Sequence, residues 1–118
     1  MRRSRYCTLV ETMSDGTEIW VSAQKEDISP EEEGRSLGDA AWGRSFARAA
    51  RNMLRRWGRW GWCTIMVTAV RAGEEGLAYV GCCSYESAED FKASYGNWTY
   101  MVNEALQELN EALTWVPV

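Results

Sequence analysis

Residues 62–84, WCTIMVTAVRAGEEGLAYVGCCS, decide the fold. The runs 62–70 and 77–84 are rich in β-branched and aromatic residues, which are enriched in strands. The connector 71–76 contains glycine twice, and glycine between two such runs is typical of a turn. The stretch therefore predicts a β-hairpin.

A second hairpin is predicted near the N-terminus. The β-rich runs 6–13 and 18–23 are separated by residues 14–17, which contain the dipeptide Asp15-Gly16. Asp-Gly between two such runs is a strong hairpin signal because both residues tolerate positive φ. The two hairpins supply four strands.

A long helix is predicted to follow the N-terminal hairpin. Ser36 and Asp39 have the spacing of a helix-capping pair, and Gly58 and Gly61 mark the end of the helix. A short helical piece precedes it, because Ser29 followed by proline is a typical helix start. The expected core-facing side of the long helix comprises Trp42, Phe46, Ala49, Met53 and Trp57.

The C-terminal part is also predicted to be helical, with Ser87 and Asp90 as a further capping pair. Its apolar face comprises Trp98, Met101, Val102, Ala105, Leu106, Leu109 and Leu113. The order β-β-α-β-β-α predicts a single α+β domain over residues 1–118. We expect a four-stranded antiparallel sheet with two amphipathic helices packed on one face. The other sheet face is expected to be open unless a partner covers it.

The most informative charged feature is the arginine row, which comprises Arg44, Arg48, Arg51 and Arg55. Spacings of four, three and four residues place these side chains on one side of the first long helix. Like charges at this spacing repel each other by about 0.2–0.5 kcal/mol per pair. Arginine also binds carboxylates and phosphates through two parallel hydrogen bonds. The row therefore predicts an anionic partner: an acidic protein, a nucleic acid or a nucleotide.

The arginine row is equally consistent with a protein that has no such partner. It could be a solvated helix face that the acidic residues 31–33 neutralise. It could also join a homodimer, because the last helix carries the acidic row Glu104, Glu108 and Glu111. Such a homo-oligomer would assemble through the complementary rows or through the open sheet face.

Two further segments are candidates for binding. Arg59 continues the arginine row, and Trp60 is expected to be free to stack on a base, although tryptophan more often packs in a core. Tyr95 and Asn97 could present aromatic and amide groups to a planar or phosphorylated ligand at a helix N-terminus. We favour Asn97 as the N-cap of that helix and expect Tyr95 to be exposed.

Few residues are candidates for catalysis or metal binding. The chain contains no His, which removes the commonest general base, the usual catalytic triad and most metal sites. Its cysteines fall in strand-like runs: Cys7, Cys63, Cys82 and Cys83. The adjacent pair Cys82-Cys83 is expected to act as small buried hydrophobes. The sequence therefore predicts a non-enzymatic protein with no cofactor and no metal. A small enzyme that uses carboxylates or a cysteine is a third hypothesis.

Composition bears on location and on the type of protein. No stretch approaches the roughly 18 consecutive apolar residues of a membrane span, so we expect a cytoplasmic protein with no membrane partner. Residues 35–59 contain seven Arg and one acid, whereas residues 86–111 contain six acids and one base. In its size, its seven Trp and this polarised charge, the chain is similar to small accessory and inhibitor proteins of phages and other mobile elements. That similarity implies a binding protein that counters a host factor, or one that sequesters a nucleotide signal.

Overall fold

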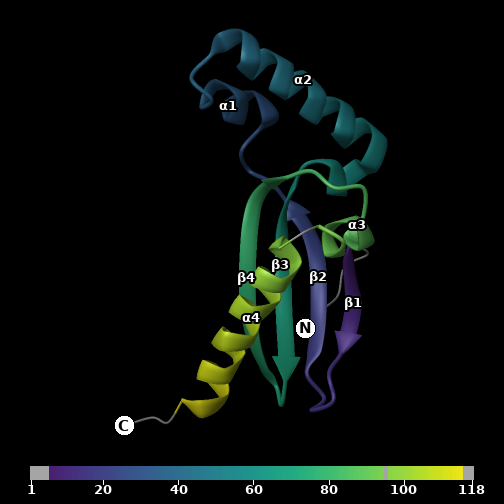
Figure 1. Ribbon diagram of the computed structural model, residues 1–118, viewed down its shortest axis with the longest axis vertical. Coiled ribbons are helices and arrows are strands. Elements are labelled where there is room, and N and C mark those ends of the chain that lie inside the picture. The colour runs from purple at the N-terminus through teal and green to yellow at the C-terminus, as the bar shows by residue number, and fades with distance from the viewer. Residues whose placement is uncertain (1–5, 95, 116–118) are drawn as a thin grey trace.

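The computed structural model describes residues 6–94 and 96–115. Its antiparallel strands lie side by side in chain order (Figure 1): β1 (Cys7–Thr12), β2 (Glu18–Lys25), β3 (Cys63–Arg71) and β4 (Glu74–Cys83). Its helices are α1 (Pro30–Arg35), α2 (Ala40–Trp57), the short 3-10 helix η1 (Gly58–Gly61), α3 (Ala88–Lys92) and α4 (Asn97–Thr114). The predicted α+β class, the four-stranded antiparallel sheet and the element order are confirmed.

The β3–β4 hairpin is tighter than the sequence indicates. Its turn consists of Ala72 and Gly73, which have φ angles of 54° and 78°. A two-residue turn with positive φ at both positions matches the twist of the flanking strands. Glu74, which the sequence places in the connector, therefore pairs with Arg71 of β3.

One sheet face is covered by α4, which packs against β4 and β3 (Figure 1). The core comprises Ile19, Val21, Ala23, Cys63, Ile65, Val67, Ala69, Ala78, Phe91, Met101, Ala105 and Leu109. The predicted apolar face of the last helix therefore faces the core. Gly76 permits the close approach of α4, because a Cβ there would lie 2.0 Å from the carbonyl oxygen of Ala105.

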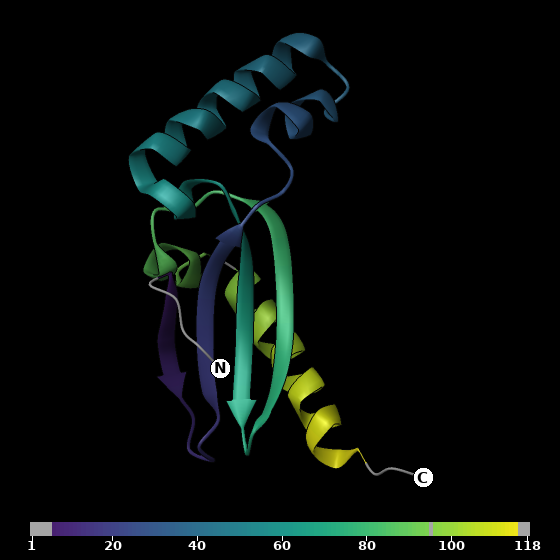
Figure 2. The ribbon, with the colours of Figure 1, turned by 180° about the vertical axis from the view of Figure 1, so that it is seen from behind.

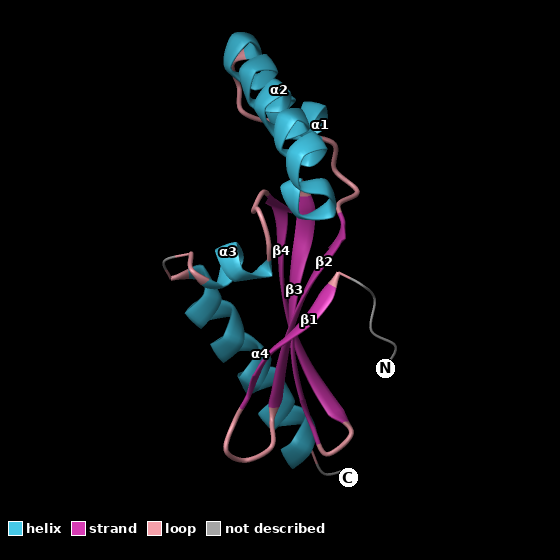
Figure 3. Ribbon diagram, turned by 90° about the vertical axis from the view of Figure 1, so that its right-hand side faces the viewer, coloured by secondary structure: helices cyan, strands magenta, loops and turns pink. Residues whose placement is uncertain are grey.

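The opposite sheet face has no described helix over it, as the edge-on view shows (Figure 3). Strand alternation places Leu9, Trp20, Met66 and Tyr79 on this face. Leu9 and Tyr79 are exposed there. Ser22 and Thr68 lie on the same face and are buried, so in the described residues this face has no helix over it but is only partly exposed.

The first long helix does not pack on the sheet, and this part of the prediction is wrong. α2 lies beyond the end of the sheet, where it packs on α1 and continues into η1 (Figures 1 and 2). Its buried residues are Gly43, Ala47 and Ala50, whereas Trp42 of the predicted core face is 61% exposed. The most buried residues of the helix are thus its smallest, which a search for large apolar residues does not select, whereas Phe46, Met53 and Trp57 of the predicted face are half-buried.

The helix boundaries follow local capping. Ser29 and Ser87 cap α1 and α3 as predicted, each accepting a hydrogen bond from a backbone N–H three residues on. The predicted start of α2 near Ser36 is wrong, because Ser36 is the C-cap of α1. The N-cap of α2 is Asp39, whose carboxylate accepts from the N–H of Trp42 at 2.7 Å.

α1 and α2 touch through their backbones at Gly34 and Gly43. A Cβ on Gly43 would lie 2.3 Å from the carbonyl oxygen of Gly34, and a Cβ on Gly34 would lie 2.4 Å from that of Gly43. Contacts this short leave no room for a methyl group. The close approach explains why the six-residue α1 can hold the much longer α2.

The substitution Gly43→Ala is expected to lower the free energy of unfolding by about 1–3 kcal/mol, because the added methyl group meets backbone atoms of α1. The better helix propensity of Ala, about 1 kcal/mol, opposes only part of this loss. Ser45→Ala, on the exposed side of α2, is the control and should change stability by less than about 0.5 kcal/mol. Urea unfolding followed by circular dichroism compares the three proteins. Equal stability of Gly43→Ala and wild type would contradict the close contact.

Candidate anion-binding surface on the α1–α2 hairpin

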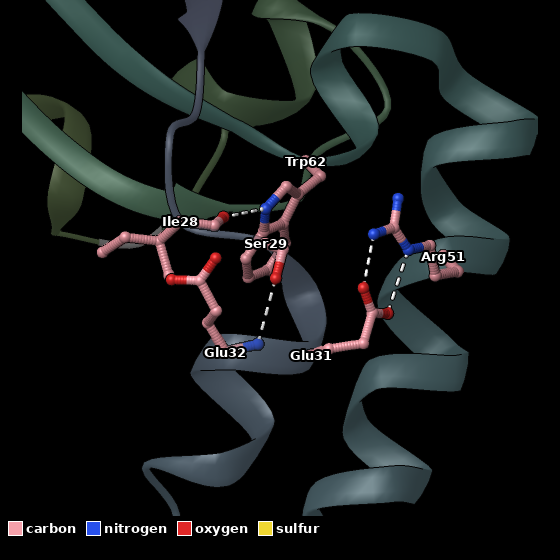
Figure 4. A network of polar contacts seen from close by, with 6 residues as sticks. All are labelled: Ile28, Ser29, Glu31, Glu32, Arg51 and Trp62. Carbon is pink, nitrogen blue, oxygen red and sulfur yellow. Dashed lines mark hydrogen bonds and ion pairs between the residues drawn. The ribbon is translucent and has the colours of Figure 1, made fainter.

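The side chain of Trp62 attaches the α1–α2 hairpin to the sheet. Trp62 directly precedes β3 and is 6% exposed. Its indole N–H donates to the carbonyl oxygen of Ile28, in the linker between β2 and α1, at 2.8 Å (Figure 4). Its ring meets the ring of Phe46 edge-to-face, with centroids 5.9 Å apart. One buried side chain therefore fixes both the entry into α1 and the position of α2.

Glu26 makes a second connection at the same end of the sheet. Its carboxylate accepts from the hydroxyl of Thr64 at 3.0 Å and from the N–H of Ile28 at 3.1 Å. It also accepts from the N–H of Cys82, which has a φ of 54° where β4 bulges against β3. Burial by itself raises the pKa of Glu26, but these hydrogen bonds outweigh it and lower the pKa. The charged form of Glu26 thus joins the linker to β3 and β4.

Glu26→Gln is expected to lower the free energy of unfolding at neutral pH by about 1 kcal/mol, because an amide accepts these hydrogen bonds less strongly than a carboxylate. The pKa of Glu26 is lowered in the folded protein, so its contribution is fully present above the ordinary value of 4.5 and is lost as pH falls through the folded-state pKa. Urea unfolding at a series of pH values should therefore show the two proteins converging in acid. A stability difference that does not change with pH would rule out a role for the charge.

Arg51 is the member of the arginine row that is paired within the chain. Its guanidinium donates two hydrogen bonds to Glu31 of α1, one of them from Nε to Oε2 at 3.0 Å (Figure 4). The hydrogen bonds from Arg51 hold the pKa of Glu31 below its ordinary value. The two side chains are 43% and 44% exposed, so the pair adds little to stability. Its effect is to orient α2 on α1 and to withdraw one guanidinium from the free surface.

The other members of the row, Arg44, Arg48 and Arg55, are exposed and form no ion pair with a described residue. Arg55 donates a hydrogen bond to the side-chain oxygen of Asn52. Arg56 is exposed as well, although its spacing does not place it in the predicted row. Since α2 contains no acidic residue, its outer surface carries uncompensated positive charge.

A groove of about 590 Å³ lies between α1 and the N-terminal half of α2. Arg35 and Arg44 line it together with the exposed Gly38. It also contains Glu31 and Asp39, but Glu31 is paired with Arg51 and Asp39 caps α2. The groove therefore extends the basic surface of α2 into a concavity.

Arg59 and Trp60 are not part of this surface. Both belong to η1, where the chain has left α2, and both are partly buried. The guanidinium of Arg59 lies 4.8 Å from the ring centroid of Tyr6. Trp60 packs against the core, and its carbonyl oxygen accepts from the N–H of Tyr85 at 2.9 Å. The structure agrees with the favoured core packing of Trp60 and not with a ring free to stack on a base.

The start of α4 also differs from the prediction. Its N-cap is Gly96, so Asn97 is the first helical residue and not the cap. The amide of Asn97 is exposed and lies 3.4 Å from the hydroxyl oxygen of Tyr85, to which it donates. The structure thus brings neither an arginine of α2 nor the groove next to this segment (Figure 1). Tyr95 lies outside the described residues.

The thiols of Cys63, Cys82 and Cys83 are poorly suited to nucleophilic chemistry. Burial raises the pKa of Cys63 and Cys82 to about 12 and the pKa of Cys83 to about 11. The sulfur of Cys82 lies 3.5 Å from a carboxylate oxygen of Glu33 and not beside an arginine. The thiolate is the reactive form of cysteine, and these surroundings disfavour it. The cysteines of the described residues are free thiols.

Metal-binding clusters and membrane-spanning helices are both absent from residues 6–94 and 96–115. No three His, Cys, Asp or Glu side chains gather there in a way that could hold a metal ion. In the same residues, every helix is too short or too polar to cross a bilayer.

No protein-family model, curated protein or solved structure matches this chain.

Proposed function

We propose that this chain is a non-enzymatic binding module that engages an anionic partner through the outer surface of α2. The observation that carries the proposal is the set of exposed guanidiniums of Arg44, Arg48 and Arg55. They lie on a helix of 18 residues that contains no acid and extends beyond the sheet (Figure 1). A partner can therefore reach them without displacing any part of the core.

The energetics of the surface support a partner. Arginines four residues apart on a helix repel each other, and a face used only for solvation usually mixes both signs of charge. A carboxylate or phosphate placed against Arg44, Arg48 or Arg55 would relieve this repulsion and accept two parallel hydrogen bonds. Binding requires little rearrangement of the surrounding structure, because Trp62 and the Gly34–Gly43 contact already fix α2 in place.

Reversal of two of these charges, Arg48→Glu with Arg55→Glu, is expected to abolish binding to an anionic matrix such as heparin and to leave the fold intact. Arg51 is left unchanged because its substitution would break the pair with Glu31. The salt concentration needed for elution is the measurement, and circular dichroism checks the fold. Retention equal to that of the wild type would exclude the outer surface of α2 as the binding site.

A matched pair of single substitutions controls for net charge. Arg48→Glu and Lys92→Glu change the net charge by the same amount, and both positions are exposed. Lys92 lies in α3, below the C-terminal end of α2 and not on its outer surface (Figure 1). Arg48→Glu should lower the elution salt clearly, and Lys92→Glu should have little effect. An equal effect of both would show that only the overall charge of the protein matters.

Self-association is a second candidate, because the chain carries an acidic row as well. Glu104, Glu108 and Glu111 are exposed on α4, which lies along the sheet face and not beside α2 (Figure 1). Contact between the acidic row and the arginine row would thus join two copies. The open sheet face offers another interface between copies.

Native mass spectrometry of the purified protein, at low and at high salt, tests this second candidate and also detects any anion that co-purifies. An oligomer that dissociates at high salt is expected if the charged rows join the copies, because salt screens exposed charges. An oligomer that persists would indicate the open sheet face. A monomer at both salt concentrations would contradict self-association.

A further inference from the structure

The side of α2 that faces away from α1 presents a strip of short side chains and hydrogen-bonding groups. Its members are exposed and recur at helical spacing: Ala41, Ser45, Arg48 and Asn52. They lie opposite the buried side, which contains Gly43, Ala47 and Ala50. We call these four exposed residues the outer strip.

The outer strip combines close approach with hydrogen bonding. Ala41 and Ser45 are short, so another molecule can come near to the helix backbone between them and Arg48. Arg, Asn and Ser are the side chains that hydrogen-bond the edges of bases in the major groove of DNA: Arg to guanine, Asn to adenine, and Ser to several bases. A strip of this composition is suited to a surface that displays such edges, once Asn52 exchanges its hydrogen bond from Arg55 for one to a base.

Arginines stand on both sides of the outer strip. At 100° per residue, Arg44 and Arg55 fall on one side of it and Arg56 falls on the other. All three are exposed and form no ion pair with a described residue. A helix that lies in a groove needs cations on both flanks, because a phosphate backbone runs along each wall.

The dimensions agree with this arrangement. The major groove of B-form DNA is about 12 Å wide, and an α-helix with its side chains is about 10–12 Å across. At 1.5 Å per residue, the 18 residues of α2 span about 27 Å. α2 lies at one end of a molecule 53 Å long, so the sheet does not block its outer side (Figures 1 and 2).

The net charge of −4 does not oppose this. The acidic charge is spread over the molecule: of the 17 acids, three lie on α4, along the sheet and away from the outer side of α2 (Figure 3), and three lie on α1. Exposed charges are largely screened beyond about 8 Å at physiological ionic strength. The acidic residues of α1 lie on the other side of α2 from the outer strip, because α1 packs against Gly43, Ala47 and Ala50.

We infer that the anionic partner is double-stranded DNA and that α2 enters its major groove with the outer strip leading. This inference rests on the proposed function and adds the identity of the partner. Double-stranded RNA fits less well, because its major groove is deep and narrow. An acidic protein could bind the arginines, but it would not require short side chains between two flanks of positive charge.

The test uses the full chain and a fluorescently labelled 20-base-pair DNA duplex of mixed sequence, with binding followed by anisotropy. Labelled double-stranded RNA of the same length and labelled poly-glutamate are the comparison probes. Binding to the DNA is expected to be the tightest of the three. If Arg44, Arg55 and Arg56 contact phosphates, the logarithm of the affinity should fall with the logarithm of the salt concentration with a slope of about −3.

Two substitutions separate groove insertion from simple charge attraction. Ser45→Leu keeps every charge and adds bulk to the outer strip, so it should weaken DNA binding at least tenfold without changing the circular dichroism spectrum. Arg56→Gln should weaken it uniformly across sequences and reduce the salt slope by about 1. Lys92→Gln is the control and should bind like the wild type.

The results of these experiments separate the inference that the partner is DNA from the more general proposal that α2 binds an anionic partner. DNA binding that Ser45→Leu leaves unchanged would overturn groove insertion. Tighter binding to poly-glutamate than to DNA would overturn the inference and keep the proposed function, with an acidic protein as the partner. Tighter binding to RNA would likewise overturn it. Binding to none of the three probes at low salt would contradict both.

Discussion

Trp62 donates its indole N–H to the carbonyl oxygen of Ile28 and packs its ring against Phe46, so a single side chain ties both the entry into α1 and the body of α2 to the start of β3. Glu26 adds hydrogen bonds to β3 and β4 at the same place. With the linker fixed in this way, α2 is directed away from the sheet and cannot fold back over it. The position of every arginine on α2 follows from this attachment.

That attachment also separates the charges of the molecule. α2 carries arginines without acids, and α4 carries glutamates without bases, yet the two helices lie on different parts of the fold (Figure 1). Had both helices shared one sheet face, as the sequence suggested, the two rows would have met at their margin. In the observed arrangement the pair Glu31–Arg51 neutralises one guanidinium, and the others stay open to another molecule.

The features that could be predicted depend on residues that are close together in the sequence. Those that could not be predicted depend on contacts between residues that are far apart in it. Both hairpins, the caps Ser29 and Ser87 and the core face of α4 follow from signals within a few residues, and the sequence reveals them. The position of α2 depends on contacts with Gly34 and Trp62, and neither leaves a periodic signal. Large apolar residues on α2 suggested burial on the sheet, whereas backbone contact at glycine decided where the helix packs.

The large apolar residues of α2 also draw attention away from the outer side of this helix, which has an unusual composition. A helix that is merely solvated gains from oppositely charged pairs three or four residues apart, and it has no reason to keep short side chains in line. Ala41, Ser45 and Asn52 are short and exposed, and the charges around them are all positive. Both properties suit the narrow anionic surface that we propose as the partner. Insertion into a DNA groove requires space beside the positive charges of the helix, whereas contact with a flat acidic surface does not.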